Sequence, residues 1–245
     1  MKFDDVKKLH QKKYRAEFGY YLVEGEHLIM ELHKACSNDA RNITLYLTEA
    51  RQDWARQLNA GFNLVVVSDK QMAQLSDTKT PQGLVACVPL PAKDRSADAA
   101  QHERCIFLHE VQDPGNLGTI IRTLAWFGGF RLLLSPNSVD PFNSKVVRAS
   151  MGAIFHLPIE TDVHLDVLPQ RFNRFACLDL DGEAINCANF AEYDCYLFGN
   201  EARGVPTNSA AMSRADAFTI PGTNTIDSLN LASSVGICAY QLSVR

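Results

Sequence analysis

The stretch Phe198-Gly199-Asn200-Glu201-Ala202-Arg203-Gly204-Val205 is followed by Ile220-Pro221-Gly222 and then by Asp227-Ser228-Leu229-Asn230-Leu231. Each of these polar segments stands directly after an apolar run typical of a strand or directly before a run typical of a helix. At such junctions, backbone N–H and C=O groups are left free to hold a ligand. The three segments therefore predict a ligand-binding site in the C-terminal half of the chain.

The rest of the C-terminal half reads as strands separated by stretches of helix length. We expect strands at residues 105–110, 130–135, 156–159, 175–180, 195–198 and 217–220. Helix-length segments between most of them predict an α/β fold with a mainly parallel sheet that is covered on both faces. A doubly wound sheet of this kind binds ligands at the carboxyl ends of its strands. The polar segments quoted above lie at those ends.

The N-terminal half alternates short strand-like runs, at residues 20–23, 43–47, 64–67 and 84–88, with helix-like segments at 4–11, 25–35, 50–59 and 69–75. This alternation predicts a small α/β layer domain. Prolines, charges and small residues then interrupt the apolar periodicity between residues 89 and 102. We therefore expect a first domain over residues 1–95, a linker over 96–102 and a second domain over 103–245.

Composition narrows the class of protein. A chain of 245 residues that is 46% hydrophobic can bury a full core in two domains. No apolar run approaches the ~20 residues that span a bilayer, and the polar N-terminus does not resemble a secretory signal, so we expect a cytoplasmic protein without a membrane segment. Seven widely spaced cysteines without a C-x-x-C pair favour small buried hydrophobes over disulfides. The histidines show no ligand spacing, so we expect no metal site.

Charge is distributed unevenly along the chain. The formal net charge is −4, but residues 1–95 hold 14 Lys and Arg against 12 Asp and Glu, whereas residues 96–245 hold 10 against 16. Six cations fall within the first fifteen residues: Lys2, Lys7, Lys8, Lys12, Lys13 and Arg15. Such a cluster can engage the phosphates of a nucleic acid, and the alternative interpretation is a solvated helical face.

Two polar residues stand out on a predicted helix that follows the first C-terminal strand. Pro114-Gly115 makes a turn, Asn116 is suited to cap the helix, and Gly128-Gly129 ends it after Phe127. The apolar residues of this helix recur at helical spacing and form a core face, and Arg122 lies off that stripe. From this helix alone, Asn116 and Arg122 are an ordinary cap and an exposed arginine.

The motif around Glu201 and the motif at Asp227–Asn230 also allow a structural interpretation. Glu201 follows a strand-like run, and a carboxylate at the start of a helix is favoured by the macrodipole. Gly199 and Gly204 instead allow the backbone to approach a ligand closely. Asp227 and Ser228 are candidates for the N-cap of the last helix, and both Ser228 and Asn230 suit local capping.

Read with Asp113-Pro114-Gly115-Asn116 and Arg122, the three segments quoted above resemble the three motifs of the SpoU (TrmH-like) branch of the SPOUT methyltransferases. Residues 12–25 and 80–86 look like the start and end of that family's N-terminal RNA-binding domain, and residues 140–152 resemble a further family segment. The resemblance implies a trefoil-knotted C-terminal α/β domain, which general folding rules would not predict, and a smaller N-terminal domain like ribosomal protein L30. It also implies a homodimer that forms through the C-terminal domain.

The sequence departs from the family pattern at two places. Gly222 stands where the family has methionine after Ile-Pro, and the run after Asn230 is Leu-Ala-Ser-Ser-Val rather than the more usual Val-Ser-Val-Ala. These departures affect individual contacts and leave the polar positions in place.

The family transfers a methyl group from S-adenosylmethionine to a ribose 2′-hydroxyl of RNA, so the resemblance implies that this chain acts on rRNA or tRNA. The catalytic residues that it implies are Asn116, Arg122, Glu201, Ser228 and Asn230. The cofactor would be held at Gly199, Ile220 and Leu229. We expect RNA to contact a set of cations made of Lys7, Lys8, Lys12, Lys13, Arg15, Lys145 and Arg148.

Two roles remain open for Arg122. A guanidinium normally stays protonated, so Arg122 acts as a base only if its site displaces the proton. In the second interpretation, which we favour, Arg122 orients the phosphate and stabilises the developing alkoxide while phosphate or water receives the proton. Two other functions compete: a non-catalytic RNA-binding protein that retains the fold, and a nucleotide-dependent oxidoreductase. The second requires a phosphate-binding glycine fingerprint that the sequence lacks.

Overall fold

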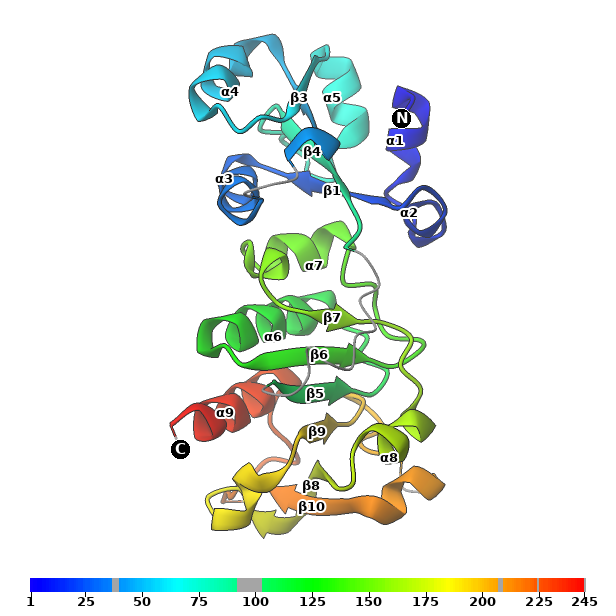
Figure 1. The fold of residues 1–245 in the computed structure, drawn as a ribbon, viewed down its shortest axis with the longest axis vertical. Helices are drawn as coiled ribbons and strands as arrows, with labels where there is room; N and C mark the ends of the chain where they lie inside the picture. The colour runs from blue at the N-terminus through cyan, green and yellow to red at the C-terminus, as the bar shows by residue number, and fades with distance from the viewer. Residues whose placement is uncertain (37–39, 92–102, 207–208, 224, 245) are drawn as a thin grey trace. The chain divides into compact units, whose positions relative to one another are not determined.

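A computed structural model describes residues 1–36, 40–91, 103–206, 209–223 and 225–244. The chain divides into two compact units (Figure 1). Unit 1 comprises Met1–Asp94 and Asp140–His156, and unit 2 comprises Arg95–Val139 and Leu157–Arg245. The predicted linker at 96–102 lies outside the described residues. The second stretch of unit 1 falls within the range that the sequence assigns to the second domain.

Unit 1 is built on a four-stranded sheet with the order β1-β4-β2-β3. Strands β1 and β2 pair antiparallel with β4, and β3 pairs parallel with β2. The strands are β1 (Tyr20–Glu24), β2 (Thr44–Leu47), β3 (Asn63–Val66) and β4 (Leu84–Pro89). All four lie close to the runs that the sequence predicts.

The helices of unit 1 are α1 (Phe3–Lys8), α2 (Lys12–Phe18), α3 (Glu26–Ala35), α4 (Gln52–Leu58), α5 (Asp69–Leu75) and α7 (Ser144–Ala149), with 3₁₀ turns η1 (Ala40–Asn42), η2 (Glu49–Arg51) and η4 (Ala153–Phe155). The helix expected at residues 4–11 ends at Lys8, and a second helix, α2, begins at Lys12. Helix α5 starts at a capping box in which Ser68 and Gln71 satisfy each other's backbone N–H groups.

The segment 140–156 belongs to unit 1 because its residues contact the N-terminal stretch, at Arg15, Tyr21, β1 and α3. The Arg15 guanidinium donates to Oδ2 of Asp140 at 2.8 Å and 2.5 Å, and to the carbonyl oxygen of Leu9 at 2.7 Å. The ring of Phe142 lies 4.9 Å from that of Tyr21. Helix α7 packs on β1, and η4 packs on α3. Apart from the bond to Leu9, these contacts join residues that are more than a hundred positions apart in the sequence.

Unit 2 is built on a six-stranded sheet with the order β10-β8-β9-β5-β6-β7, in which every pairing is parallel. The strands are β5 (Arg104–Leu108), β6 (Phe130–Leu134), β7 (Ile159–Glu160), β8 (Phe175–Ala184), β9 (Cys195–Phe198) and β10 (Ala215–Thr219). The prediction of an α/β fold with a mainly parallel sheet is confirmed. Strand β7 begins later than expected because His156 still ends the η4 turn.

The helices of unit 2 are α6 (Pro114–Phe127), α8 (Leu168–Arg171) and α9 (Leu231–Ser243), with 3₁₀ turns η5 (Leu165–Val167), η6 (Ala188–Glu192) and η7 (Ala210–Arg214). Helices α6 and α9 pack against each other (Figure 1). The apolar stripe that the spacing predicts on α6 is fully buried at Leu117, Ile120, Ile121 and Leu124, and its last member, Ala125, is partly buried. The trefoil knot and the likeness of the N-terminal part to ribosomal protein L30 stay predictions.

Five of the seven cysteines are buried, in line with their predicted role as small hydrophobes: Cys87, Cys105, Cys177, Cys195 and Cys238. Within the described ranges, no helix is long and apolar enough to cross a membrane. The same residues contain no group of three or more His, Cys, Asp or Glu that could hold a metal ion.

The Arg15–Asp140 pair gives a test of how firmly the segment 140–156 belongs to unit 1. The side chain of Arg15 is only 5% exposed, so Asp140→Asn would leave a buried guanidinium without a charged partner. We expect the free energy of unfolding to fall by about 3 kcal/mol, measured by urea denaturation. The control Asp53→Asn breaks an exposed pair with Arg56 and should cost less than about 1 kcal/mol. Equal effects of the two substitutions would contradict this role of the pair.

Candidate active site

The topology of unit 2 brings three loops to one point on the sheet. The chain moves from β5 to β6 on one side, and later returns through β8 to β9 on the other side of β5. The strand order therefore reverses at β5, and ligands of doubly wound sheets bind outside the carboxyl ends of the strands at such a point. The loops that follow β5, β6 and β9 meet there.

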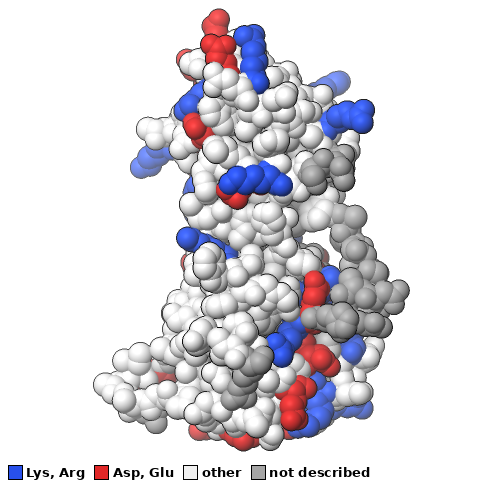
Figure 2. All heavy atoms as spheres, turned by 60° about the vertical axis from the view of Figure 1, so that its left-hand side comes forward, with Lys and Arg blue, Asp and Glu red and all other residues white. Residues whose placement is uncertain are grey.

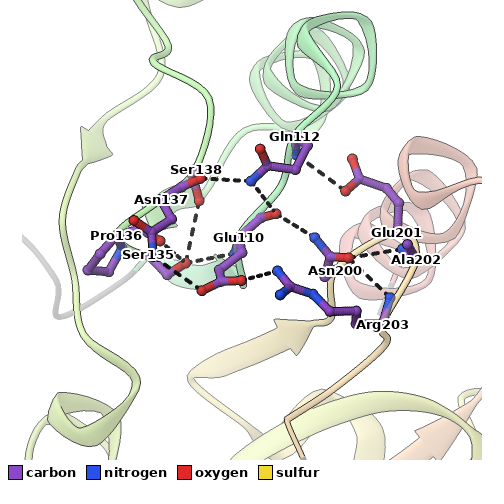
Figure 3. A network of polar contacts seen from close by, with 10 residues as sticks. All are labelled: Glu110, Gln112, Ser135, Pro136, Asn137, Ser138, Asn200, Glu201, Ala202 and Arg203. Carbon is purple, nitrogen blue, oxygen red and sulfur yellow. Dashed lines mark hydrogen bonds and ion pairs between the residues drawn. The ribbon is translucent and has the colours of Figure 1, made fainter.

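Glu110, just after β5, connects the three loops (Figure 3). Its N–H donates to Oγ of Ser135 at 2.7 Å, and its carbonyl oxygen accepts from Nε2 of Gln112 at 3.0 Å and from Nδ2 of Asn200 at 2.7 Å. Its carboxylate pairs with Arg203. The backbone of Glu110 has φ +49°, a left-handed conformation that side chains other than glycine seldom adopt. A residue held there by so many contacts is typical of a functional site.

Asn200 shapes the loop that follows β9. Its side chain is 7% exposed, and its Oδ1 accepts from the N–H groups of Ala202 at 3.0 Å and Arg203 at 3.1 Å. The backbones of Asn200 and Gly204 exchange hydrogen bonds of 2.9 Å and 2.8 Å, which closes a tight turn. Because this segment is a turn, Glu201 does not stand at the start of a helix, and the macrodipole interpretation is wrong for it.

A chain of hydrogen bonds joins three of the predicted catalytic residues. Nδ2 of Asn230 donates to Oδ1 of Asn116 at 2.9 Å, and Nδ2 of Asn116 donates to Oε1 of Glu201 at 3.3 Å. The carboxylate of Glu201 also accepts from the N–H groups of Gln112 at 3.2 Å and Asp113 at 3.4 Å. We call Asn230, Asn116 and Glu201 the polar triad. It connects the start of α9, the first turn of α6 and the loop after β9.

The structure corrects one predicted helix cap and selects one of the candidates for another. Asp113, not Asn116, caps α6, because its Oδ1 accepts from the N–H of Asn116 at 2.7 Å. The cap of α9 is Asn230 rather than Asp227 or Ser228, since its Oδ1 accepts from the N–H groups of Ala232 and Ser233. Asn116 therefore keeps its whole side chain for the polar triad, and Asn230 serves both the helix and the triad.

The other predicted site residues of unit 2 lie outside this chain of hydrogen bonds. Arg122 lies on the exposed side of α6, about 9 Å further along the helix axis than Asn116, and makes no hydrogen bond within the described part of the chain. Ser228 and Leu229 belong to the exposed segment before α9, and Ile220 directly follows β10. Gly199 lies against the backbone of Gly204.

Several polar residues of this site were not among the predicted site residues: Glu110, Gln112, Asp113, Asn200 and Arg203. Asp113, Asn200 and Arg203 stand within quoted motifs, so their position there was a usable signal. Next to them, burial lowers the pKa of His109, which favours the neutral form of its imidazole. The left-handed backbone of Glu110 leaves no signature in the sequence.

The cations predicted to bind RNA, all of which lie in unit 1, differ in availability. Arg15 was predicted to contact RNA, but its guanidinium is buried and bonded to Asp140, so it is not available to a phosphate. Lys7 and Lys8 pair with Asp4 and Asp5. The remaining cations are exposed or partly exposed: Lys12, Lys13, Lys145 and Arg148.

Two protein-family models match the chain. The model of the SpoU rRNA Methylase family matches residues 103–240, and the MRM3-like substrate binding domain matches residues 2–86. The chain belongs to the SpoU rRNA methylase family. The matched range contains the whole polar triad and Arg122.

Individual relatives cover nearly the full chain. The 23S rRNA (guanosine(2553)-2′-O)-methyltransferase RlmP of Bacillus subtilis is 29% identical over 98% of this chain and 95% of its own length. An uncharacterized tRNA/rRNA methyltransferase of Synechocystis is 30% identical over 96% of this chain and 88% of its own. A solved structure of an AdoMet-bound rRNA methyltransferase from Sinorhizobium meliloti has a TM-score of 0.81 at 28% identity, and covers 98% of this chain and 93% of that one.

These comparisons confirm the prediction of a SpoU-type RNA 2′-O-methyltransferase that uses S-adenosylmethionine. They favour an enzyme over the alternative of a non-catalytic RNA-binding protein. The roles of the individual site residues stay predictions.

Gly199 allows a test of the turn after β9. A Cβ atom at Gly199 would lie 2.2 Å from the carbonyl carbon of Gly204 and 2.5 Å from the nitrogen of Val205. The obstacle is the protein's own backbone, so Gly199→Ala should lower the free energy of unfolding by about 3 kcal/mol in urea denaturation. At Gly222 a Cβ atom meets nothing within 4 Å, so Gly222→Ala should change it by less than about 0.5 kcal/mol. A Gly199→Ala protein as stable as Gly222→Ala would refute this packing.

The double role of Asn230 can be separated by two substitutions. Asn230→Ala removes both the helix cap and the bond to Asn116, whereas Asn230→Asp keeps the capping oxygen and loses only the donor. Asn230→Ala should therefore lower stability by about 1 kcal/mol, and Asn230→Asp should leave it nearly unchanged. Both should lose methyl transfer. Wild-type transfer by Asn230→Asp would show that the bond to Asn116 is dispensable.

Proposed function

We propose that this protein transfers the methyl group of S-adenosylmethionine to a ribose 2′-hydroxyl of ribosomal RNA. The observation that carries the proposal is the polar triad at the point where the strand order reverses, in a chain of the SpoU family. Ribosomal rather than transfer RNA is favoured because the RlmP relative, aligned over nearly the whole chain, is named as an enzyme of 23S rRNA.

The loops beside the triad fit a sulfonium cofactor with an adenosine group. Residues 221–223 and 225–229 are exposed, so their backbone groups are free to bind the cofactor, and Ile226 and Leu229 add exposed apolar side chains. Gly199, Ile220 and Leu229 would hold the cofactor mainly through backbone atoms. Bound S-adenosylmethionine supplies an activated methyl group for in-line displacement.

The remaining chemistry falls to side chains. The 2′-oxygen must lose its proton, or nearly so, while it is held at near-attack distance from the methyl carbon. Arg122 would orient a phosphate of the RNA and stabilise the developing alkoxide, with phosphate or water as the proton acceptor. Asn116, Glu201, Ser228 and Asn230 would hold the ribose in register. The hydrogen bonds of the triad support this because they fix two amides and a carboxylate before substrate arrives.

Unit 1 would bind the RNA. Two observations support this role of unit 1. It contains the match to a substrate-binding domain, and it carries the exposed cations Lys12, Lys13 and Lys145. Their phosphate contacts would make binding depend on salt. A cytoplasmic location follows from a ribosomal substrate and stays part of the proposal.

Unit 2 would pair with a second copy of itself through α6 and α9. Trp126 on α6 is 84% exposed, and Ile237 and Tyr240 on α9 are exposed as well. Exposed apolar side chains gathered on neighbouring helices are typical of an interaction surface. The side of Figure 1 on which these helices lie is turned toward the viewer in Figure 2, where most of the visible surface of unit 2 carries no charged side chain.

The function is tested by mapping 2′-O-methyl groups in total RNA from strains with and without the protein. One or a few rRNA riboses should lose their methyl group in the strain that lacks it. Unchanged rRNA together with a lost tRNA methyl group would overturn the choice of substrate, and unchanged RNA throughout would overturn the activity.

Arg122 is tested by its conservative replacement. Arg122→Lys retains the positive charge but loses the planar fork of donors, so methyl transfer should fall more than about tenfold, or 1.4 kcal/mol in the barrier. The affinity for S-adenosylmethionine, measured by calorimetry, should stay at the wild-type value because Arg122 lies outside the proposed cofactor loops. Retention of more than a tenth of the activity would count against the role.

The proposed dimer is tested at Trp126. Trp126→Glu places a charge in an apolar interface and should weaken dimerisation at least about 30-fold, as for the loss of a contact worth about 2 kcal/mol. Sedimentation equilibrium measures the change. Leu180→Glu removes an exposed apolar side chain on β8, away from both helices, and serves as the control. A dimer that is equally stable in both variants would place the interface elsewhere.

A further inference from the structure

Unit 1 contains an open pocket of about 320 Å³ that no sequence motif predicts. Its walls come from three parts of unit 1: Glu24, Gly25, His27 and Leu28 at the end of β1 and the start of α3, Thr78, Thr80 and Gln82 of the loop before β4, and Arg148 and Met151 at the end of α7. The volume is at the lower end of the ~300–1,000 Å³ that small-molecule sites occupy. It suits a ligand of the size of one nucleotide.

The one carboxylate among the residues that line this pocket is already used by the protein. Glu24 accepts hydrogen bonds from the hydroxyl of Ser76, from Oγ1 of Thr78 at 2.6 Å and from the N–H of Asp77 at 3.0 Å. The carboxylate of Glu24 therefore holds the loop 76–78 in place, and it already has hydrogen-bond donors when a ligand enters. The polar side chains left for a ligand are those of His27, Thr80, Gln82 and Arg148, of which Arg148 alone carries a permanent positive charge.

Gln82 presents an oriented donor. The N–H of Glu26 can only donate, so the atom of Gln82 that lies 3.0 Å from it is the carbonyl oxygen Oε1. The backbone of Gln82 is held in turn by Nε of Arg51 at 2.9 Å. Gly25 leaves room for this arrangement, because a Cβ atom there would lie 3.2 Å from Oε1. Nε2 of Gln82 is thereby fixed and has no acceptor among the described residues.

Arg148 supplies the cation. Its Nη1 is buried without a hydrogen-bond partner and lies 3.7 Å from Oδ2 of Asp77, which is too far for a hydrogen bond. That Oδ2 atom instead accepts from Oγ of Ser144 at 2.7 Å. The Arg148 side chain as a whole is 41% exposed, so an anionic group in the pocket can reach the guanidinium and compete with its long ion pair to Asp77.

Met151 and Leu28 supply an apolar surface. Met151 is 46% exposed at the rim and has φ +53°, a left-handed conformation that methionine rarely adopts. It is held by Gly152, which packs so closely on α3 that a Cβ atom would lie 2.6 Å from Cβ of Glu31. A polarisable thioether kept in contact with solvent in this way suits the face of a planar ring.

We propose that this pocket takes one unpaired nucleotide of the RNA substrate. The base lies against Met151 and Leu28, Nε2 of Gln82 donates to an acceptor on the edge of the base, and Arg148 binds the phosphate. Sequence-specific recognition of RNA works largely through bases that are splayed out of single-stranded loops and read in this manner. The inference rests on the proposed function, and it adds a contact by which unit 1 selects its RNA.

The test compares charge-matched variants of the full chain. Gln82→Glu keeps the oxygen that accepts from Glu26 and removes only the donor, and Gln74→Glu makes the same change on the exposed side of α5. Affinity is measured for large-subunit rRNA from a strain that lacks the protein. Gln82→Glu should bind at least about tenfold more weakly than Gln74→Glu. Arg148→Met should likewise bind more weakly than Arg56→Met, which removes an exposed cation on α4. Equal affinities within each pair would overturn the proposal.

A direct readout uses the ¹³C-methyl signal of Met151, which Met151→Leu identifies. Saturating rRNA should shift this signal. A signal that nucleoside monophosphates shift but rRNA does not would overturn the proposal in favour of a free nucleotide. Methyl transfer is scored separately on the same RNA. Its absence alongside a shifted Met151 signal counts against the proposed function alone, whereas normal transfer with an unshifted signal overturns the pocket alone.

Discussion

The buried side-chain amide of Asn200 is the constraint on which the site depends. It donates to the carbonyl oxygen of Glu110 and accepts two N–H groups of its own turn, so it ties the loop after β9 to the loop after β5. Gly199 allows that turn to close against Gly204 without a side chain between them. The closed turn directs Glu201 toward Asn116 and the backbone of Gln112, which completes the polar triad.

The strands could be predicted from the sequence more completely than the placement of the side chains. Apolar runs identify the central strands β5, β6 and β9 because these are buried along nearly their whole length, and the motifs that follow the strands indicate where the site lies. The caps could not be assigned, since Asp113 and Asn116 are both good capping residues and only the contact with Glu201 separates their roles. The place of residues 140–156 in unit 1 was also hidden, because the Arg15–Asp140 bond joins positions 125 residues apart.

The burial of Arg15 changes the electrostatic account of the N-terminal region. In the sequence, the cations between Lys2 and Arg15 suggest one phosphate-binding surface. In the structure, some of them are engaged in contacts within the protein and others are exposed. Arg15 holds unit 1 together, Lys7 and Lys8 pair with acids of α1, and Lys12 and Lys13 remain exposed. In our account, RNA recognition therefore depends on few exposed charges together with the proposed nucleotide pocket of unit 1. The chemistry belongs to unit 2.

The most direct measurement of the central claim is the nucleoside composition of large-subunit rRNA, taken from a strain that lacks the protein and then incubated with it and S-adenosylmethionine. We predict a 2′-O-methylnucleoside as the product of the wild-type protein and of the control Glu192→Gln, which changes an exposed acid on η6. Glu201→Gln, which removes the charge at the centre of the triad, should form at least about tenfold less product. A base-methylated product, or equal yields from Glu201→Gln and the wild type, would contradict the account.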